Sequence, residues 1–272
     1  MAAVSTAGFI DSHRNSTDAE LAQALVETAG GLALAMRDEG LETGQKTSVS
    51  DVVTNADTAA EEFVAEALEQ LRPQDGIVGE EGAAKASISG RTWVVDPVDG
   101  TYNFASGSDY FCSALALVEG EVSDPDRILA SAVHRPALAT TWVADNGSAT
   151  RNGRTLEQLI DAPLPHLALA TYLHPTSMKN DGIRNAWLDA TNSAATVRMF
   201  GAGSVDLASV ASGGVGGWLQ HSVADWDWLP GKALVEAAGG KAVKVDAGGV
   251  TWCVAGNHQL VDEVLAKLEQ HG

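Results

Sequence analysis

Apolar residues recur every three to four positions in several segments of the chain, the spacing that places them on one face of an α-helix. The clearest segment runs from Asp18 to about Arg37, and Ser16 or Thr17 can cap its start. The spacing predicts helices over residues 18–37, 54–71, 204–211, 229–238 and 261–270. Residues 1–15 carry no such pattern, and we expect them to form a loose end.

Short apolar runs between turn signals predict β-strands. They cover residues 77–79, 93–95, 111–118, 129–133, 140–144, 167–172 and 196–200. A polar connector over residues 40–50 holds Lys46. Because helices and strands alternate, the pattern favours an α/β fold.

The local sequence pattern changes near residue 150, where turn-forming residues become frequent. Asn-Gly turn signals at 146–147 and 152–153 are followed by prolines within the next dozen residues or so. We therefore expect a single domain over residues 1–272 that divides into subdomains 1–150 and 151–272.

The composition is strongly acidic. The chain has 272 residues, with 17 Lys and Arg against 36 Asp and Glu, a net charge of −19. Such a surface repels the phosphates of nucleic acids and anionic lipids, so we expect no nucleic-acid partner and no membrane attachment. No apolar run reaches membrane-spanning length, and the first residues lack the pattern of a secretion signal. Cys112 and Cys253 show no CxxC spacing and read as buried reduced thiols of a cytoplasmic protein.

Several common catalytic motifs are absent. The chain contains no HExxH, no P-loop and no GxSxG sequence, which counts against histidine-ligated zinc, P-loop nucleotide and serine-nucleophile chemistry. Gly201-Ala202-Gly203 begins like a dinucleotide fingerprint but lacks the third glycine. Metal chemistry based on carboxylates stays open, and an acidic protein suits cations.

The most informative segment is Trp93-Val94-Val95-Asp96-Pro97-Val98-Asp99-Gly100-Thr101. We expect the apolar strand to end at Asp96, with Asp99 three residues further on, and Pro97 stiffens the backbone between the two carboxylates. The Val98 carbonyl can then also point inward, which gives the oxygen donors that Mg²⁺ prefers. Gly100 allows backbone N–H groups to approach a bound anion. Asp-Pro or Asp-Gly alone is usually an ordinary turn, but both together after an apolar strand favour a functional site.

Further acidic residues lie at the ends of other predicted elements. Glu80 and Glu81 follow the strand at 77–79, where a solvated turn is the alternative. Asp227 lies between two tryptophans just before a predicted helix, where a helix N-cap is the alternative. Asp57 closes the sequence Thr54-Asn55-Ala56-Asp57, which also fits a capping box.

These segments occur together in one order. The glutamate pair lies in GEEG at 79–82, the aspartate pair in WVVDPVDGTYNF at 93–104, and Asp227 in a WD element followed by EAAGG at 236–240. Lys46, the T-x-x-D stretch and the Arg-Asn-Gly turn at 151–153 fit the same pattern. Over nearly its whole length the chain thus resembles the inositol monophosphatase family of Mg²⁺-dependent, Li⁺-sensitive phosphatases.

The resemblance implies two Mg²⁺ ions, with a loosely held third, at these carboxylates. The implied metal ligands are Glu80, Asp96, the Val98 carbonyl, Asp99 and Asp227. Asp57 and Thr101 would orient and deprotonate the attacking water, and Glu81 is a further catalytic candidate. The implied substrate-binding residues are Asp99, Gly100, Thr101, Gly201, Gly203 and Gln220, with Lys46 in an outer shell.

The resemblance also implies a layered αβαβα sandwich of the inositol monophosphatase and fructose-1,6-bisphosphatase type, whose N-terminal α+β part has a mainly antiparallel sheet. It implies a homodimer and a small phosphorylated metabolite as substrate, with inositol monophosphate as the first expectation. Histidinol phosphate, fructose 1,6-bisphosphate and a nucleotide 3′-phosphate are alternatives, as is a non-catalytic binding or regulatory role. Three departures bear on this choice: Tyr102 replaces a frequent second threonine, Trp228–Gly231 replace x-A-A-G, and Gln220 replaces a frequent Glu.

Overall fold

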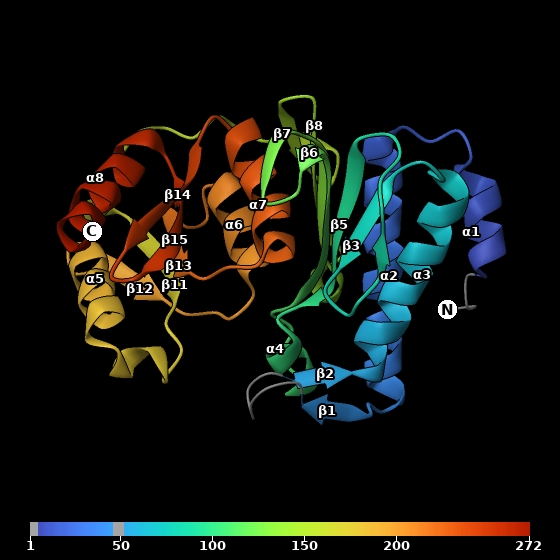
Figure 1. The fold of residues 1–272 in the computed structure, drawn as a ribbon, viewed down its shortest axis with the longest axis horizontal. Coiled ribbons are helices and arrows are strands. Elements are labelled where there is room, and N and C mark those ends of the chain that lie inside the picture. The colour runs from blue at the N-terminus through green and yellow to red at the C-terminus, as the bar shows by residue number, and fades with distance from the viewer. Residues whose placement is uncertain (1–4, 46–51) are drawn as a thin grey trace.

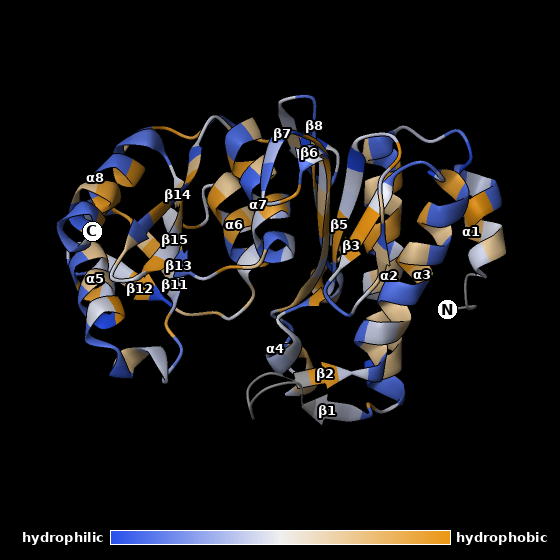
Figure 2. Ribbon diagram, viewed as in Figure 1, coloured by the Kyte–Doolittle hydropathy of each residue, from blue (hydrophilic) through white to orange (hydrophobic). Residues whose placement is uncertain are grey.

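Two large β-sheets alternate with three layers of helices in the computed structural model, which describes residues 5–45 and 52–272 and also has a two-stranded sheet. From right to left, Figure 1 shows helices α1–α3, the larger sheet, helices α6 and α7, the smaller sheet, and helices α5 and α8. This arrangement confirms the α/β class and the layered αβαβα sandwich. Figure 2 shows apolar residues on the strands and on the helix faces turned toward them.

Helices α2 (Asp18–Glu39) and α3 (Asn55–Leu71) cover the outer face of the larger sheet, and α1 (Thr6–His13) packs against α3. Thr17 caps α2 through a capping box with Glu20, whose carboxylate accepts the Thr17 N–H at 2.8 Å. Helix α1 corrects the expected loose end, because its Phe9 is buried and lies edge-on against Phe63 of α3 at 5.1 Å between ring centroids. A contact with another helix thus stabilises a segment whose own pattern is weak.

The larger sheet has eight strands in the order β10-β9-β8-β7-β6-β5-β3-β4, and only β3 and β5 are parallel. Its strands are β3 (Gly76–Gly79), β4 (Ala84–Lys85), β5 (Arg91–Asp99), β6 (Cys112–Glu121), β7 (Asp124–Arg135), β8 (Thr140–Asp145), β9 (Ser148–Arg151) and β10 (Arg154–Thr155). The expectation that β5 ends at Asp96 was wrong, since the strand continues through a bulge to Asp99. A short strand β1 (Thr43–Gln45) lies inside the expected polar connector and pairs with β2 (Val52–Thr54), which follows the connector. Lys46 lies outside the described residues.

The smaller sheet has the strand order β12-β11-β13-β15-β14, and all of its strands follow residue 155 in the chain. Its strands are β11 (Ala168–Tyr172), β12 (Thr196–Arg198), β13 (Gly217–His221), β14 (Lys241–Ala247) and β15 (Val250–Gly256). Helices α6 (Gly203–Ala211) and α7 (Asp225–Ala237) separate the two sheets, while α5 (Asp181–Thr191) and α8 (His258–Leu268) cover the outer face. The sequence patterns did not predict β13, β14, β15 or α5. The division into subdomains near residue 150 stays a prediction.

The main core lies between the two sheets, around α6 and α7, and it includes Trp218 and Trp228. Cys112 and Cys253 are both buried and unpaired, as expected. Helix α7 begins earlier than predicted, so Asp227 lies in its first turn rather than at the N-cap, and Pro230 lies inside the helix rather than in the first turn. Within residues 5–45 and 52–272, no helix is both long and apolar enough to cross a membrane.

Candidate active site

The end of β5 places two carboxylates on one side of the sheet. In a regular strand, residues three apart point to opposite faces. Here the pairing with β6 shifts between Asp96 and Asp99, so that Asp96 pairs with Ala114 and Asp99 with Cys112. Because a bulge of this kind re-aims a side chain, Asp96, Asp99 and Asp227 each offer an oxygen within 4.8 Å of the other two. We call these three residues the carboxylate cluster.

The environment of Asp96 disfavours a bare negative charge. Its pKa is raised well above its ordinary value, first by burial and then by the charges of Glu80, Asp99 and Asp227. Its Oδ1 accepts the Val98 N–H at 3.0 Å. Its Oδ2 is buried and has no hydrogen-bond partner among the described residues. A cation at this point would neutralise the repulsion and satisfy the buried oxygen, so the donor set fits a divalent metal such as Mg²⁺.

Asp99 connects the carboxylate cluster to the start of α6. It accepts hydrogen bonds from the Gly203 N–H at 3.2 Å and the Ser204 N–H at 2.5 Å. Burial raises the pKa of Asp99, although these N–H groups act in the opposite direction. The backbone N–H of Gly203 therefore helps to orient one carboxylate of the cluster.

A second acidic group lies beside Thr101. Asp57 Oδ2 accepts hydrogen bonds from the Thr54 N–H at 2.9 Å and the Thr54 hydroxyl at 2.5 Å, so the capping box exists. Its Oδ1 lies 3.2 Å from Thr101 Oγ1, which is also 3.0 Å from the Val98 carbonyl oxygen. Burial raises the pKa of Asp57, and the charge of Glu81 adds to that rise. The capping and functional interpretations of Asp57 therefore describe the same side chain.

Glu61 positions the turn that carries Glu80 and Glu81, and sequence reasoning missed it. This buried side chain of α3 accepts the Glu81 N–H at 2.8 Å and the Ala83 N–H at 2.7 Å. A Cβ on Gly79 would lie 2.3 Å from a Glu61 oxygen, so only glycine fits there. The available signal was a glutamate four residues after Asp57, which a helix places on the same face.

Gly100 brings the two halves of the site together. It has a φ of 88°, and a Cβ there would lie 2.9 Å from the Ala202 Cβ and 3.1 Å from the Gly201 oxygen. Asn103, also missed from sequence, donates from its amide to the carbonyls of Tyr110 at 2.9 Å and Phe200 at 2.7 Å. The segment after β5 is therefore tied directly to the segment before α6.

These elements surround a cleft of about 520 Å³. The predicted site residues that line it are Glu80, Asp99, Gly100, Thr101, Gly201, Gly203, Gln220 and Asp227. Asp96, Val98, Asp57 and Glu81 lie behind or beside this lining, connected to it by the contacts described above. The part of the lining that was not predicted includes Tyr102, Tyr172, His174 and Met199.

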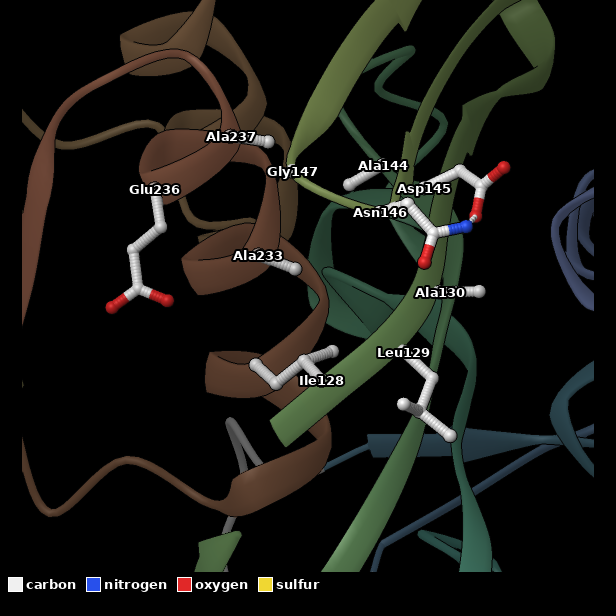
Figure 3. A pocket seen from close by; sticks show the side chains of 10 residues that line it. All are labelled: Ile128, Leu129, Ala130, Ala144, Asp145, Asn146, Gly147, Ala233, Glu236 and Ala237. Atoms are coloured by element: carbon white, nitrogen blue, oxygen red, sulfur yellow. Dashed lines mark hydrogen bonds between the residues drawn. The ribbon is translucent and has the colours of Figure 1, made fainter. Parts of the chain in front are cut away.

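A smaller cavity of about 180 Å³ lies between β7, β8 and helix α7. Figure 3 shows that its side chains are mostly small or aliphatic, among them Ile128, Ala130 and Ala233. It reaches Glu236 near the end of α7, whereas Asp227 lies in that helix's first turn. With about 1.5 Å of rise per residue, the two are more than two helical turns apart, so this cavity is separate from the carboxylate cluster.

Comparison with known proteins places these features in a wider group. Residues 14–271 match the model of the inositol monophosphatase family. The histidinol-phosphatase of Mycobacterium tuberculosis is 32% identical over 232 residues, covering 79% of this chain and 84% of that protein. The inositol-1-monophosphatase of Rhizobium meliloti is 33% identical over 204 residues, 74% of each chain. The structure of inositol monophosphatase from Anabaena (Nostoc) sp. PCC 7120 has a TM-score of 0.77 at 25% identity, covering 93% of this chain and 96% of that one.

Proposed function

This chain belongs to the inositol monophosphatase family, whose members are phosphatases that hydrolyse phosphoric monoesters, and we propose that it releases phosphate from a small polyol phosphate, with inositol monophosphate as the first candidate. The observation that carries the proposal is the carboxylate cluster at the floor of the cleft. Three acidic oxygens within 4.8 Å of one another, beside a buried oxygen without a donor, match the needs of hard divalent cations.

In this proposal Asp96, Asp99, Asp227, Glu80 and the Val98 carbonyl hold two Mg²⁺ ions, with a third ion loosely bound. Bound Mg²⁺ ions would lower the pKa of a coordinated water and stabilise the charge that develops on the phosphate.

Thr101 and Asp57 prepare the attack by water. The single Thr101 O–H can donate to Asp57 Oδ1, so that Thr101 Oγ1 can take a proton from the water as its own proton passes to the Asp57 carboxylate. Burial makes the Asp57 carboxylate a stronger base, and the two bonds from Thr54 hold it in place. The Gly100 and Thr101 N–H groups are proposed to bind the phosphate, since Gly100 keeps the backbone accessible there.

Histidinol phosphate is the second candidate substrate. Gln220 lines the cleft from β13 at the position where inositol-phosphate enzymes often carry Glu. A carboxylate only accepts hydrogen bonds, whereas the Gln amide also donates. The 32% identity to a histidinol-phosphatase supports this alternative without deciding it.

The test is phosphate release from inositol 1-phosphate, histidinol phosphate, fructose 1,6-bisphosphate and 3′-phosphoadenosine 5′-phosphate, each with and without Mg²⁺. We expect one ester to turn over only with Mg²⁺ and to lose at least a hundredfold in rate in Asp99→Asn. Asp38→Asn is the matched control, because Asp38 is an exposed aspartate near the end of α2. If a folded protein hydrolyses none of the four esters, a non-catalytic binding role would replace the proposal.

The same proposal includes inhibition by Li⁺ and a cytoplasmic homodimer. Li⁺ would compete with Mg²⁺ at the second metal position, so the extent of inhibition by Li⁺ would change with the Mg²⁺ concentration. Sedimentation velocity would report the mass in solution, and a monomer at micromolar concentration would remove the dimer from the proposal.

A further inference from the structure

The outer part of the cleft differs chemically from its floor. Three of the exposed large apolar side chains line it: Tyr102 is 56% exposed, Tyr172 36% and Met199 44%. Scattered exposed apolar residues need no explanation, but a group of them around one opening indicates a binding surface.

The aromatic residues come from segments far apart in the chain. Tyr102 lies in the short helix α4 (Thr101–Ala105), directly after Thr101, whereas Tyr172 ends β11. Tyr102 and Tyr172 line the same cleft. His174 follows on the same side, with 6.3 Å between the ring centroids of Tyr172 and His174 and 55° between their planes. We call Tyr102, Tyr172 and His174 the aromatic rim.

Among the described residues of the cleft lining, all that belong to the types Asp, Glu, Lys and Arg are acidic. Glu80, Asp99 and Asp227 line the cleft, and no Lys or Arg occurs among the described residues of the lining. Even with two divalent cations bound at the floor, the described lining holds no Lys or Arg to pair with a second phosphate. A substrate with one phosphate and a neutral or cationic remainder suits this arrangement better than a bisphosphate.

We infer that the aromatic rim selects phosphate monoesters whose leaving group carries a flat, uncharged or cationic ring, and that Tyr172 and Tyr102 are the residues that determine this specificity. The inference rests on the proposed phosphatase activity, and within it favours histidinol phosphate, the second candidate, over inositol monophosphate, whose ring is a puckered polyol. The ring packs against the tyrosine faces while the phosphate lies over the carboxylate cluster. Aromatic faces attract flat rings and, through the ring quadrupole, cations. Gln220 can donate or accept a hydrogen bond from the remaining polar group of such a substrate.

The experiment compares benzyl phosphate and histidinol phosphate with glycerol 2-phosphate, which has no ring, and with fructose 1,6-bisphosphate. All are assayed with saturating Mg²⁺. We expect kcat/KM for the ring-bearing esters to exceed that for glycerol 2-phosphate by about tenfold, and the bisphosphate to be the poorest substrate. Because the rim contacts the ring in both the ground state and the transition state, the difference should appear mainly in KM.

The variants separate the rim from the catalytic groups. Tyr172→Ala should lower kcat/KM for benzyl phosphate about tenfold more than for glycerol 2-phosphate, while Tyr172→Phe should retain the preference because it keeps the ring. Ile160→Ala is the control, since Ile160 is an exposed apolar residue that does not line the cleft.

Each outcome has a distinct meaning. Mg²⁺-dependent hydrolysis of glycerol 2-phosphate without any preference for a ring, or an equal loss on both esters in Tyr172→Ala, would overturn the inference and leave the proposed function intact. No Mg²⁺-dependent hydrolysis of any ester would overturn both.

Discussion

Glu61→Gln changes one buried atom and should weaken both the fold and cation binding. Each carboxylate oxygen of Glu61 accepts one backbone N–H, from Glu81 at 2.8 Å and from Ala83 at 2.7 Å. Glutamine has a single carbonyl oxygen, so one of these N–H groups would face the amide NH₂. An unpaired donor costs about 1–3 kcal/mol when it is buried; these two N–H groups are partly buried, but their hydrogen bonds go to a charged carboxylate and are at the stronger end. We therefore expect a net loss of about 2 kcal/mol.

This loss should be visible in two measurements. For a chain of this length, about 2 kcal/mol corresponds to a fall of roughly 5 °C in the thermal midpoint. The turn held by Glu61 carries Glu80, whose charge acts on Asp96. If about 1.4 kcal/mol of the loss appears in cation binding, the Mg²⁺ concentration for half-maximal activity rises about tenfold.

Glu62→Gln is the matched control, because Glu62 is the next residue on α3 and is exposed. It should leave the thermal midpoint and the Mg²⁺ dependence unchanged. An unchanged midpoint in Glu61→Gln would refute the energetic argument. A lower midpoint with an unchanged Mg²⁺ dependence would refute the link between this turn and the metal site.

Three further predictions concern buried groups near the site. Burial raises the pKa of Asp206 to about 7 from 3.8, so the folded chain holds this proton more tightly than the unfolded chain, and the resulting stabilisation is complete below pH 3.8 and lost as the pH rises through 7. Between pH 5 and 8 the unfolding free energy of the metal-free protein should therefore fall by roughly 3 kcal/mol more than that of Asp206→Asn. Urea titrations that give both proteins the same dependence of unfolding free energy on pH would contradict this. Asp96→Asn should raise the thermal midpoint in EDTA at pH 8 and abolish the increase that Mg²⁺ gives, because it removes a buried charge that a cation would neutralise; a midpoint still raised by Mg²⁺ would argue against Asp96 as a ligand. Gly100→Ala should destabilise by more than Gly107→Ala in urea unfolding, since both have positive φ but only Gly100 would place its Cβ 2.9 Å from Ala202; equal losses would show that backbone strain alone matters.

The parts of the fold that the sequence predicted are those with strong local signals. Helices α2 and α3 combine long apolar faces with capping boxes at Thr17 and Thr54, so local and tertiary preferences agree. Helix α1 depends on one ring contact with α3, which no local pattern reveals. Helix α5 and the β14–β15 pair had signals that were overlooked: Asn180 caps α5, and Gly248-Gly249 connects β14, in which burial largely alternates, to the apolar strand β15.

The residues of the proposed site likewise divide into those with a strong local sequence signal and those without one, and the reason is chemical. Residues proposed to bind cations must be acidic and must lie at points where the backbone is fixed, so the Asp-Pro-Val-Asp-Gly sequence carries a strong signal. The sequence pattern does not predict the bulge that turns Asp96 and Asp99 to one side, but it does identify the two aspartates. Glu61 and Asn103 instead act on backbone N–H and C=O groups that only the folded chain brings together. The aromatic rim has the weakest signal of all, because its tyrosines are 70 residues apart in the sequence. The residues proposed to bind cations therefore have a local sequence signal, whereas the residues proposed to select the substrate come together only when distant segments fold against each other. Exchanging Tyr172 should consequently alter which ester is hydrolysed more than how it is hydrolysed.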